Sequence, residues 1–150
     1  RSPVMPALKE SVAVVIRDQD GRFLVTERPD DPDDELAGLW GFPAATRRPG
    51  EDPRSAALRI GPLKLGVTLT VGAKLGEMTG DRGSYLLRLA EYAATIEAGR
   101  PSVPQPDDSV TQYAACRFTS EPGLLRPAAR RGSLCARIFL QSVGQDWRGE

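Results

Sequence analysis

The side chains that could do chemistry in this chain are carboxylates, Lys, Arg, Tyr, Ser, Thr and Cys, because its 150 residues include no histidine. This absence excludes Ser-His-Asp and Cys-His catalysis, histidine metal ligation and a histidine pH switch. The two cysteines, Cys116 and Cys135, cannot form a four-ligand zinc site or a disulfide scaffold. Both are expected to be small buried core residues.

The charge balance argues against nucleic acid as the main partner. Twenty Lys and Arg side chains balance twenty Asp and Glu side chains, whereas binding to a phosphate backbone usually leaves a basic excess. No segment approaches the roughly 18 consecutive apolar residues of a membrane span. Residues 1–6 also lack the apolar core of a signal peptide. The sequence therefore predicts a soluble cytoplasmic protein with no membrane partner.

Candidate functional residues concentrate between positions 38 and 67. Residues 38–43 read Gly-Leu-Trp-Gly-Phe-Pro, and residues 49–51 read Pro-Gly-Glu. Arg59 and the pair Gly66-Val67 follow. Without a gap, these residues resemble the lead and the box of the Nudix family, which hydrolyses nucleoside diphosphate derivatives.

The resemblance implies an α+β Nudix fold, in which a mixed β-sheet is sandwiched between helices (α/β/α). It implies that residues 1–150 form a single Nudix-like domain, with the box at residues 45–67. It also makes a nucleotide-like small molecule the expected partner. Homodimers are common in the family, so a homodimer is a further expectation, although no residue here specifies it.

The box departs from the family pattern at its metal ligands. In the family, the Glu after the box Arg and a Glu pair three residues further hold Mg²⁺ against the diphosphate. A hard dication needs carboxylate oxygens to bind there, neutralise phosphate charge and activate a water. The residues at these positions are Ile60, Leu63 and Lys64. None can ligate Mg²⁺ through its side chain, and Lys64 would repel it.

Two other changes point the same way. Ala45 replaces the first glycine of the box, and Gly61-Pro62 is expected to stop or sharply kink the helix that should present the ligands. Glu51 and Arg59 remain as the candidate catalytic remnants of the box. Their favoured interpretation is a local ion pair with a structural role.

The first functional hypothesis is therefore a Nudix-fold protein with little or no metal-dependent hydrolysis, which binds a nucleotide-like or other anionic ligand, or a protein. Lys and Arg can contact phosphate oxygens without a metal. Arg59 and Arg48 are candidates for such contacts. The candidate ligand-binding residues are Arg28, Trp40, Arg47, Lys64, Asp107 and Asp108.

The second hypothesis is an active hydrolase whose metal site has been rebuilt from other carboxylates. Mg²⁺ or Mn²⁺ would be a cofactor only in this case. At least two carboxylates must then converge on one ion. The candidates are Glu51, Glu77, Asp81, Glu91, Asp107 and Asp108.

The third hypothesis is an interaction module that exposes Trp40, Phe42 and Tyr113 as a partner surface. For Trp40 and Phe42, a place in the core or in a pocket wall is the favoured interpretation. Substrate specificity would come from the loops at residues 29–38 and 98–109. These loops carry no recognisable signature, so the ligand cannot be identified from the sequence.

The elements that must position these residues are clearest in the first half. Two β-rich runs within residues 11–28 join at Asp20-Gly21, a signal for a tight hairpin. Residues 29–35 form a loop, because prolines and like charges oppose regular structure. Asp52 should cap a helix with Pro53 in its first turn. That helix should span about two turns before Gly61-Pro62.

The second half is predicted to contain strands and one closing helix. Residues 84–96 form a longer strand or strand pair, although their Ala and Leu content also permits a helix. The other elements are strands at 66–72 and 110–119, a loop at 98–109 and an amphipathic helix at 127–143.

Overall fold

The computed structural model describes residues 7–148. Residues 1–6, on which the signal-peptide expectation rests, lie outside this range. Within residues 7–148, no helix is long and apolar enough to cross a membrane. The strands are β1 (Ala7–Ile16), β2 (Phe23–Glu27), β3 (Trp40–Gly41), β4 (Ala44–Thr46), β5 (Thr68–Asp81), β6 (Tyr85–Ala98) and β7 (Ala115–Thr119). The helices are α1 (Pro53–Ile60), the π-helix η1 (Gly61–Leu65), the 3-10 helix η2 (Pro122–Leu125), α2 (Arg126–Arg130) and α3 (Leu134–Ser142).

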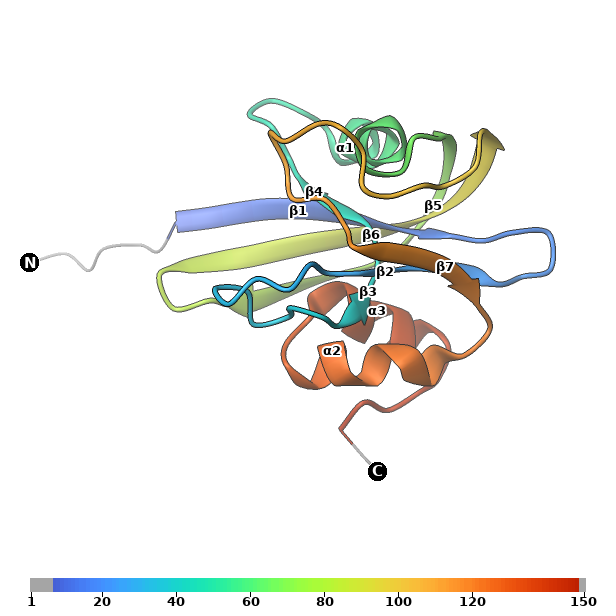
Figure 1. Ribbon diagram of the computed structural model, residues 1–150. Coiled ribbons are helices and arrows are strands. Elements are labelled where there is room, and N and C mark those ends of the chain that lie inside the picture. Colours follow the sequence, from blue (N-terminus) through green and yellow to red (C-terminus); the bar gives the residue numbers. More distant parts are fainter. Residues whose placement is uncertain (1–6, 149–150) are drawn as a thin grey trace, which may run out of the picture.

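The strands form two sheets between helices. One sheet is mixed, with the order β4-β1-β6-β5 and a parallel β1–β6 pair, and the other is antiparallel, with the order β3-β2-β7. Helix α1 covers one side of the strands, and α2 and α3 cover the opposite side (Figure 1). This arrangement confirms the expected α+β fold with helices on both sides.

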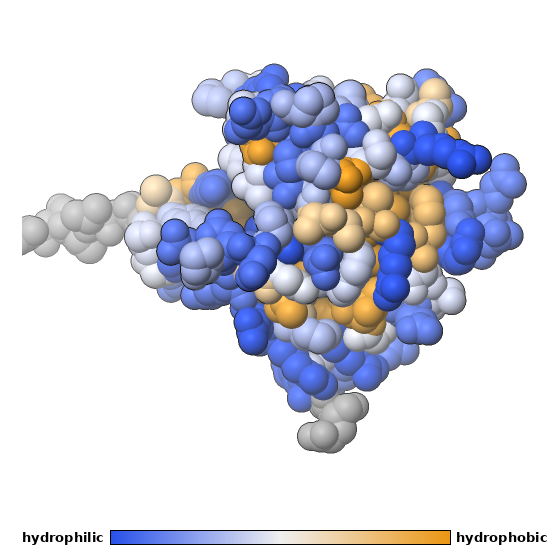
Figure 2. All heavy atoms as spheres, viewed as in Figure 1, coloured by the Kyte–Doolittle hydropathy of each residue, from blue (hydrophilic) through white to orange (hydrophobic). Residues whose placement is uncertain are grey.

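Strand β1 shows why helices are needed on both sides. Its residues 12–16 are apolar at every position, so both faces of the strand carry apolar side chains. Val12 and Val14 pack in the cluster that contains Ile60 of α1. Val15 packs in the cluster that contains Phe139 of α3. The visible face in Figure 2 is accordingly hydrophilic at its top and bottom and more hydrophobic in the middle.

The turn at Asp20-Gly21 is present, but the two strands beside it do not form the predicted hairpin. The amide of Asp18 donates to the carbonyl of Arg22 at 2.9 Å, and Gly21 has a φ of 79°. After a single bridge between Arg17 and Phe23, β1 and β2 separate into different sheets. The reason is that β4 and β6 already occupy the two edges of β1, which leaves no edge for β2.

The other strands differ from their predicted lengths. Residues 84–96 belong to one strand, β6, and not to a helix. β5 extends well beyond residue 72, because β6 pairs with it over nearly its whole length despite three glycines that weaken its strand signal. β7 is shorter than residues 110–119 and is an edge strand, so Cys116 is only half-buried, contrary to expectation.

The predicted closing helix at 127–143 is divided into α2 and α3. Gly132 separates them with a φ of 101°, which favours glycine. Ser133 then caps α3, because its side chain accepts a hydrogen bond from the amide of Ala136. Cys135, in the first turn of α3, is buried as expected.

Helix α1 begins and ends where predicted, but a second type of helix follows it directly. The Asp52 side chain accepts a hydrogen bond from the amide of Ser55 at 3.1 Å, and Pro53 occupies the first turn. The α-helix ends at Ile60, yet the chain continues helically through η1. Pro62 lies in the first turn of this wider helix, where its missing N–H is tolerated. The α-helix thus stops before Gly61-Pro62 after about two turns, as predicted, but the chain after it stays helical in this wider form instead of leaving the helix.

Candidate anion-binding site

Glu51 and Arg59 form the expected ion pair. The two carboxylate oxygens of Glu51 accept from Nη2 and Nε of Arg59 at 2.7 and 2.8 Å. Arg59 also donates to the carbonyl of Thr46 at 3.0 Å, and the amide of Arg48 donates to Glu51 at 3.0 Å. These bonds, with that from Arg59 contributing most, lower the pKa of Glu51 to about 2. The pair ties α1 to the preceding turn.

Arg47 also serves the local structure of the box. Its guanidinium donates to the carbonyl of Glu51 at 2.7 and 3.0 Å and to the carboxylate of Glu10 at 2.6 Å. These contacts place Arg47 between β1 and the turn before α1. Arg47 therefore does not line the pocket that holds Arg28 and Trp40.

The three positions that correspond to family metal ligands have different surroundings. Ile60 is 0% exposed and lies in the core beneath α1. Leu63 is half-buried and faces a surface cavity that Asp107 also lines. Lys64 is 7% exposed. Ile60 and Lys64 are thus buried, whereas Leu63 is partly exposed.

Lys64 is a buried cation without an ion-pair partner in residues 7–148. Its Nζ lies 5.1 Å from the centroid of the Tyr113 ring, a cation–π distance. Burial, together with the positive charges of Arg28 and Arg59, lowers the pKa of Lys64 to about 8. The local environment therefore favours an added negative charge.

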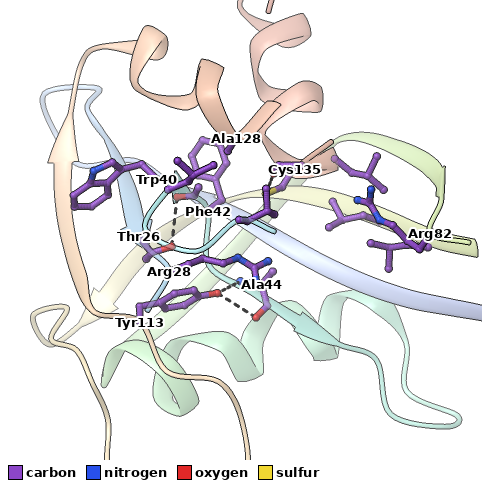
Figure 3. Close-up of a pocket in the computed structure, with 16 residues that line it drawn as sticks. Thr26, Arg28, Trp40, Phe42, Ala44, Arg82, Tyr113, Ala128 and Cys135 are labelled. Atoms are coloured by element: carbon purple, nitrogen blue, oxygen red, sulfur yellow. Dashed lines mark hydrogen bonds between the residues drawn. The ribbon is translucent and has the colours of Figure 1, made fainter. Parts of the chain in front are cut away.

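Tyr113 connects Lys64 to a pocket between the sheets and the C-terminal helices. A cavity of about 60 Å³ is lined by Arg28, Trp40, Phe42, Tyr113 and Cys135, among others. Figure 3 shows Phe42 and Cys135 on the side of α3 and Tyr113 on the side of α1, with Arg82 at the far end. Phe42 and half-buried Trp40 thus form pocket wall, as favoured from the sequence.

The small cavity adjoins a larger and more polar one of about 460 Å³. Arg28, Leu36, Arg82 and Leu87 line both. Arg28 is partly exposed and forms a 3.3 Å ion pair with Asp34 in the loop after β2. A ligand in the larger cavity could therefore contact Arg28 while one end enters the smaller cavity.

Tyr113 is a site residue that the sequence did not identify as such. The third hypothesis offered it as an exposed aromatic, but it is buried, as is Phe42. The Tyr113 hydroxyl accepts from the amide of Ala44 at 2.9 Å, and burial raises its pKa to about 12. Tyr113 follows an irregular loop, so no periodicity in the sequence could have indicated its inward position.

The carboxylates proposed for a rebuilt metal site are engaged in separate places. Glu77 bonds to Lys74 at 2.8 Å on β5, and Asp81 bonds to the amide of Gly83 in the following turn. Asp107 bonds to Ser109 in an exposed loop that also contains Asp108. Across residues 7–148, no group of three or more Asp, Glu or Cys side chains could hold a metal ion. The carboxylate oxygens of the described residues are therefore not arranged to hold the Mg²⁺ that the family uses.

Comparisons with known proteins agree with this fold. A family model described as NUDIX domain matches residues 7–126. No curated protein matches the sequence significantly. The ORF135 protein of E. coli is similar in structure, with a TM-score of 0.67, 24% identity and coverage of 92% of this chain and 94% of that one.

Two further solved structures show the same fold. The MutT protein of Methanosarcina mazei Go1 has a TM-score of 0.71 and 17% identity, with 95% of this chain and 97% of that chain covered. The C. elegans Ap4A hydrolase, solved as a binary complex, has a TM-score of 0.63 and 16% identity, with 91% and 95% covered. At these identities the similarity concerns the fold.

Proposed function

The chain belongs to the NUDIX family, and we propose that it binds the anionic group of a nucleotide-like small molecule through its own side chains, with little or no metal-dependent hydrolysis. The family and the likeness to an Ap4A hydrolase support a nucleotide-like ligand. The replaced metal ligands support binding without hydrolysis. In this proposal the protein is a pseudoenzyme.

The observation that carries the proposal is the Lys64 side chain, which is only 7% exposed and has no carboxylate partner in residues 7–148. It occupies the position of the last metal-ligating glutamate, and its contact is the face of Tyr113 rather than a carboxylate. A buried charge without a partner is unfavourable, and an incoming phosphate oxygen would relieve that cost. Lys64 would thus supply the positive charge that a metal ion supplies in active relatives.

Arg28 is the second residue proposed to contact the anion. It lines both cavities and is close enough to Lys64 to lower its pKa. Its existing partner, Asp34, is 3.3 Å away in a partly exposed pair, which holds the guanidinium weakly. A phosphate group has the geometry to replace that carboxylate in a bidentate contact with arginine.

The test is titration calorimetry with inorganic pyrophosphate and nucleoside diphosphates in the presence of a chelator. We expect binding that persists without divalent metal. Lys64→Met should weaken it about tenfold or more. Lys74→Met, at an exposed lysine of β5 paired with Glu77, is the matched control and should leave affinity unchanged. Absence of binding in the wild type would overturn the proposal.

Hydrolysis is tested separately by mass spectrometry of products. The substrates are nucleoside triphosphates, nucleotide sugars, ADP-ribose and dinucleoside polyphosphates, each with Mg²⁺, Mn²⁺ or chelator. We expect no chelator-sensitive turnover. Turnover that requires metal and is lost in Glu51→Gln would instead support the rebuilt metal site.

A further inference from the structure

A cleft of about 430 Å³ is lined by residues of both sheets. Its lining comes from β6, β7, the turn between β1 and β2 and the loop after β6, and includes Arg17, Asp18, Thr95, Ile96, Arg100 and Phe118. The ends of β6 and β7 and the turn between β1 and β2 lie on the same side of the molecule, at the right of Figure 1. This Phe118 cleft shares no lining residue with the two cavities that Arg28 lines. It is therefore a separate feature of the surface.

Half-buried apolar side chains form part of the wall of the Phe118 cleft. Ile96 and Phe118 both pack against the core cluster that contains Ile60, and both remain partly exposed. Pro101 adds a third half-buried apolar side chain. Because β6 and β7 belong to different sheets and do not pair, their ends leave this apolar surface open. Small-molecule sites are typically apolar clefts of about 300–1,000 Å³, and the Phe118 cleft is of that kind.

Two arginines supply positive charge at the cleft. The guanidinium of Arg17 donates through Nη1 to the carbonyl of Gly21 at 2.7 Å. It also lies 5.7 Å from the ring centres of Phe23 and Phe139. These contacts hold the Arg17 side chain in place while leaving other N–H groups free to donate. The exposed Arg100 side chain has no hydrogen-bond or ion-pair partner within residues 7–148.

The carboxylate of Asp18, which also lines the cleft, does not neutralise these arginines. Its Oδ1 accepts from the amides of Asp20 and Arg22, each at 2.9 Å. Its Oδ2 accepts from Nε of Arg22 at 2.9 Å. Arg17 and Arg100 form no ion pair with any carboxylate of residues 7–148. The cleft therefore combines an apolar wall with unpaired positive charge.

We propose that the Phe118 cleft is a second ligand site, which binds a small amphipathic anion with its apolar body against Ile96 and Phe118 and its anionic group beside Arg17 and Arg100. Burial of the apolar body supplies affinity, and charge-assisted hydrogen bonds to guanidinium groups select an anion. A neutral hydrocarbon would use only the first feature, and a bare phosphate only the second. The site goes beyond the proposed function, because Lys64 takes no part in it.

The test is an NMR titration of the isotope-labelled protein with octanoate, an unbranched alkyl carboxylate, and with octanamide, its uncharged analogue. Octanoate should shift the amide signals of residues 95–100 and Phe118, with a Kd of about 1 mM or tighter. Octanamide should bind about tenfold more weakly, because it lacks the charge that the arginines select. Inorganic pyrophosphate, the probe of the proposed function, should leave these signals unchanged.

Three variants assign the binding to the cleft. Arg100→Gln removes an exposed guanidinium, so it should weaken octanoate binding about fivefold or more while octanamide binding stays within about twofold. Thr95→Phe fills the cleft from an exposed strand position and should abolish binding of both probes. Arg88→Gln is the matched control, because Arg88 is an exposed arginine of the same strand that does not line the cleft. It should change neither affinity.

The outcomes separate this site from the site at Lys64. Absence of octanoate binding, or shifts confined to residues outside the cleft, would overturn the inference. Equal affinity for octanoate and octanamide would also overturn it, because the arginines would then select nothing. If the cleft signals move with protein concentration alone and light scattering shows a dimer, a second copy covers the cleft and the inference fails. Lys64→Met that loses pyrophosphate binding but keeps octanoate binding would support two independent sites, whereas wild type that binds octanoate but not pyrophosphate would reject only the proposed function.

Discussion

The ammonium of Lys64 lies 5.1 Å from the centre of the Tyr113 ring. Lys64 belongs to η1 and stands at a position where the family has a metal-ligating glutamate. The aromatic face partly compensates the buried charge but does not neutralise it. The contact joins Lys64, a changed residue of the box, to Tyr113, a residue far away in the sequence that lines the small cavity. It is the basis of the first two predictions.

Replacement of Lys64 should stabilise the protein while it removes anion binding. Lys64→Met keeps the length of the side chain and removes a buried, unpaired charge, so we expect the free energy of unfolding at pH 7 to rise by about 1–3 kcal/mol. Denaturant unfolding measures this change. A loss of stability would show that the Lys64 charge holds the folded state together.

The stability contributed by Lys64 should also depend on pH. Its pKa is about 8 in the folded protein and 10.5 ordinarily. Between these values the unfolded chain binds more protons than the folded chain, so stability rises as the pH increases through this window. Below pH 8, the burial of the charged Lys64 side chain lowers the free energy of unfolding by its full amount. The wild type should therefore gain stability relative to Lys64→Met between pH 8 and 10, as denaturant titrations at several pH values would reveal.

The Glu51–Arg59 pair should contribute to stability near neutral pH. The pKa of Glu51 is about 2 in the folded protein, below its ordinary value of 4.5. The stability that the pair contributes is therefore present above pH 4.5 and is lost as the pH falls towards 2. Glu51→Gln should destabilise by about 1–2 kcal/mol at pH 7. Glu77→Gln, in an exposed pair, should change stability little. Equal effects of the two substitutions in thermal melts would contradict this prediction.

Gly61 should not tolerate a side chain, although it borders a helix. A Cβ at this position would lie 2.6 Å from the carbonyl oxygen of Val67 and 2.9 Å from Cγ of Leu69. Helix propensity alone favours alanine by up to about 1 kcal/mol, but this clash should make Gly61→Ala destabilising by about 1–3 kcal/mol. Gly123→Ala, where the Cβ meets open space, is the control. A stabilised Gly61→Ala in chemical denaturation would refute the close approach.

Restoring glutamate at the metal-ligand positions should not restore a metal site. Ile60 is completely buried in the core, so Ile60→Glu should destabilise by about 3 kcal/mol or more. Leu63→Glu, at a half-buried position, should cost much less. Magnesium titration of a combined Leu63→Glu and Lys64→Glu variant should show no tight binding. Magnesium-dependent turnover in that variant would mean that the helix still presents the ligands on one face.

Several features of this protein follow from neighbouring residues and were predictable from the sequence. The tight turn at Asp20-Gly21 and the Asp52 cap before Pro53 depend on local hydrogen bonds and backbone preferences. The Glu51–Arg59 pair and the altered metal positions were also visible, because the box has fixed spacing. The family resemblance then indicated the fold.

Other features depend on contacts between residues that are far apart in the chain. The separation of β1 from β2 depends on β4 and β6, which occupy both edges of β1. Tyr113 reaches the pocket because its hydroxyl bonds to the backbone of Ala44, 69 positions away. The burial of Glu91 results from strands and a helix that meet only in the folded chain.

The sequence alone determined which residues replace the metal ligands, because that information is the identity of the side chains. Tertiary structure decided what surrounds those side chains, because packing buries Ile60 in the core and Lys64 against Tyr113 and leaves Leu63 partly exposed. Tertiary structure also decided which groups are charged. The pKa values of Lys64 and Glu91 depend on burial, and burial is a property of the packed protein.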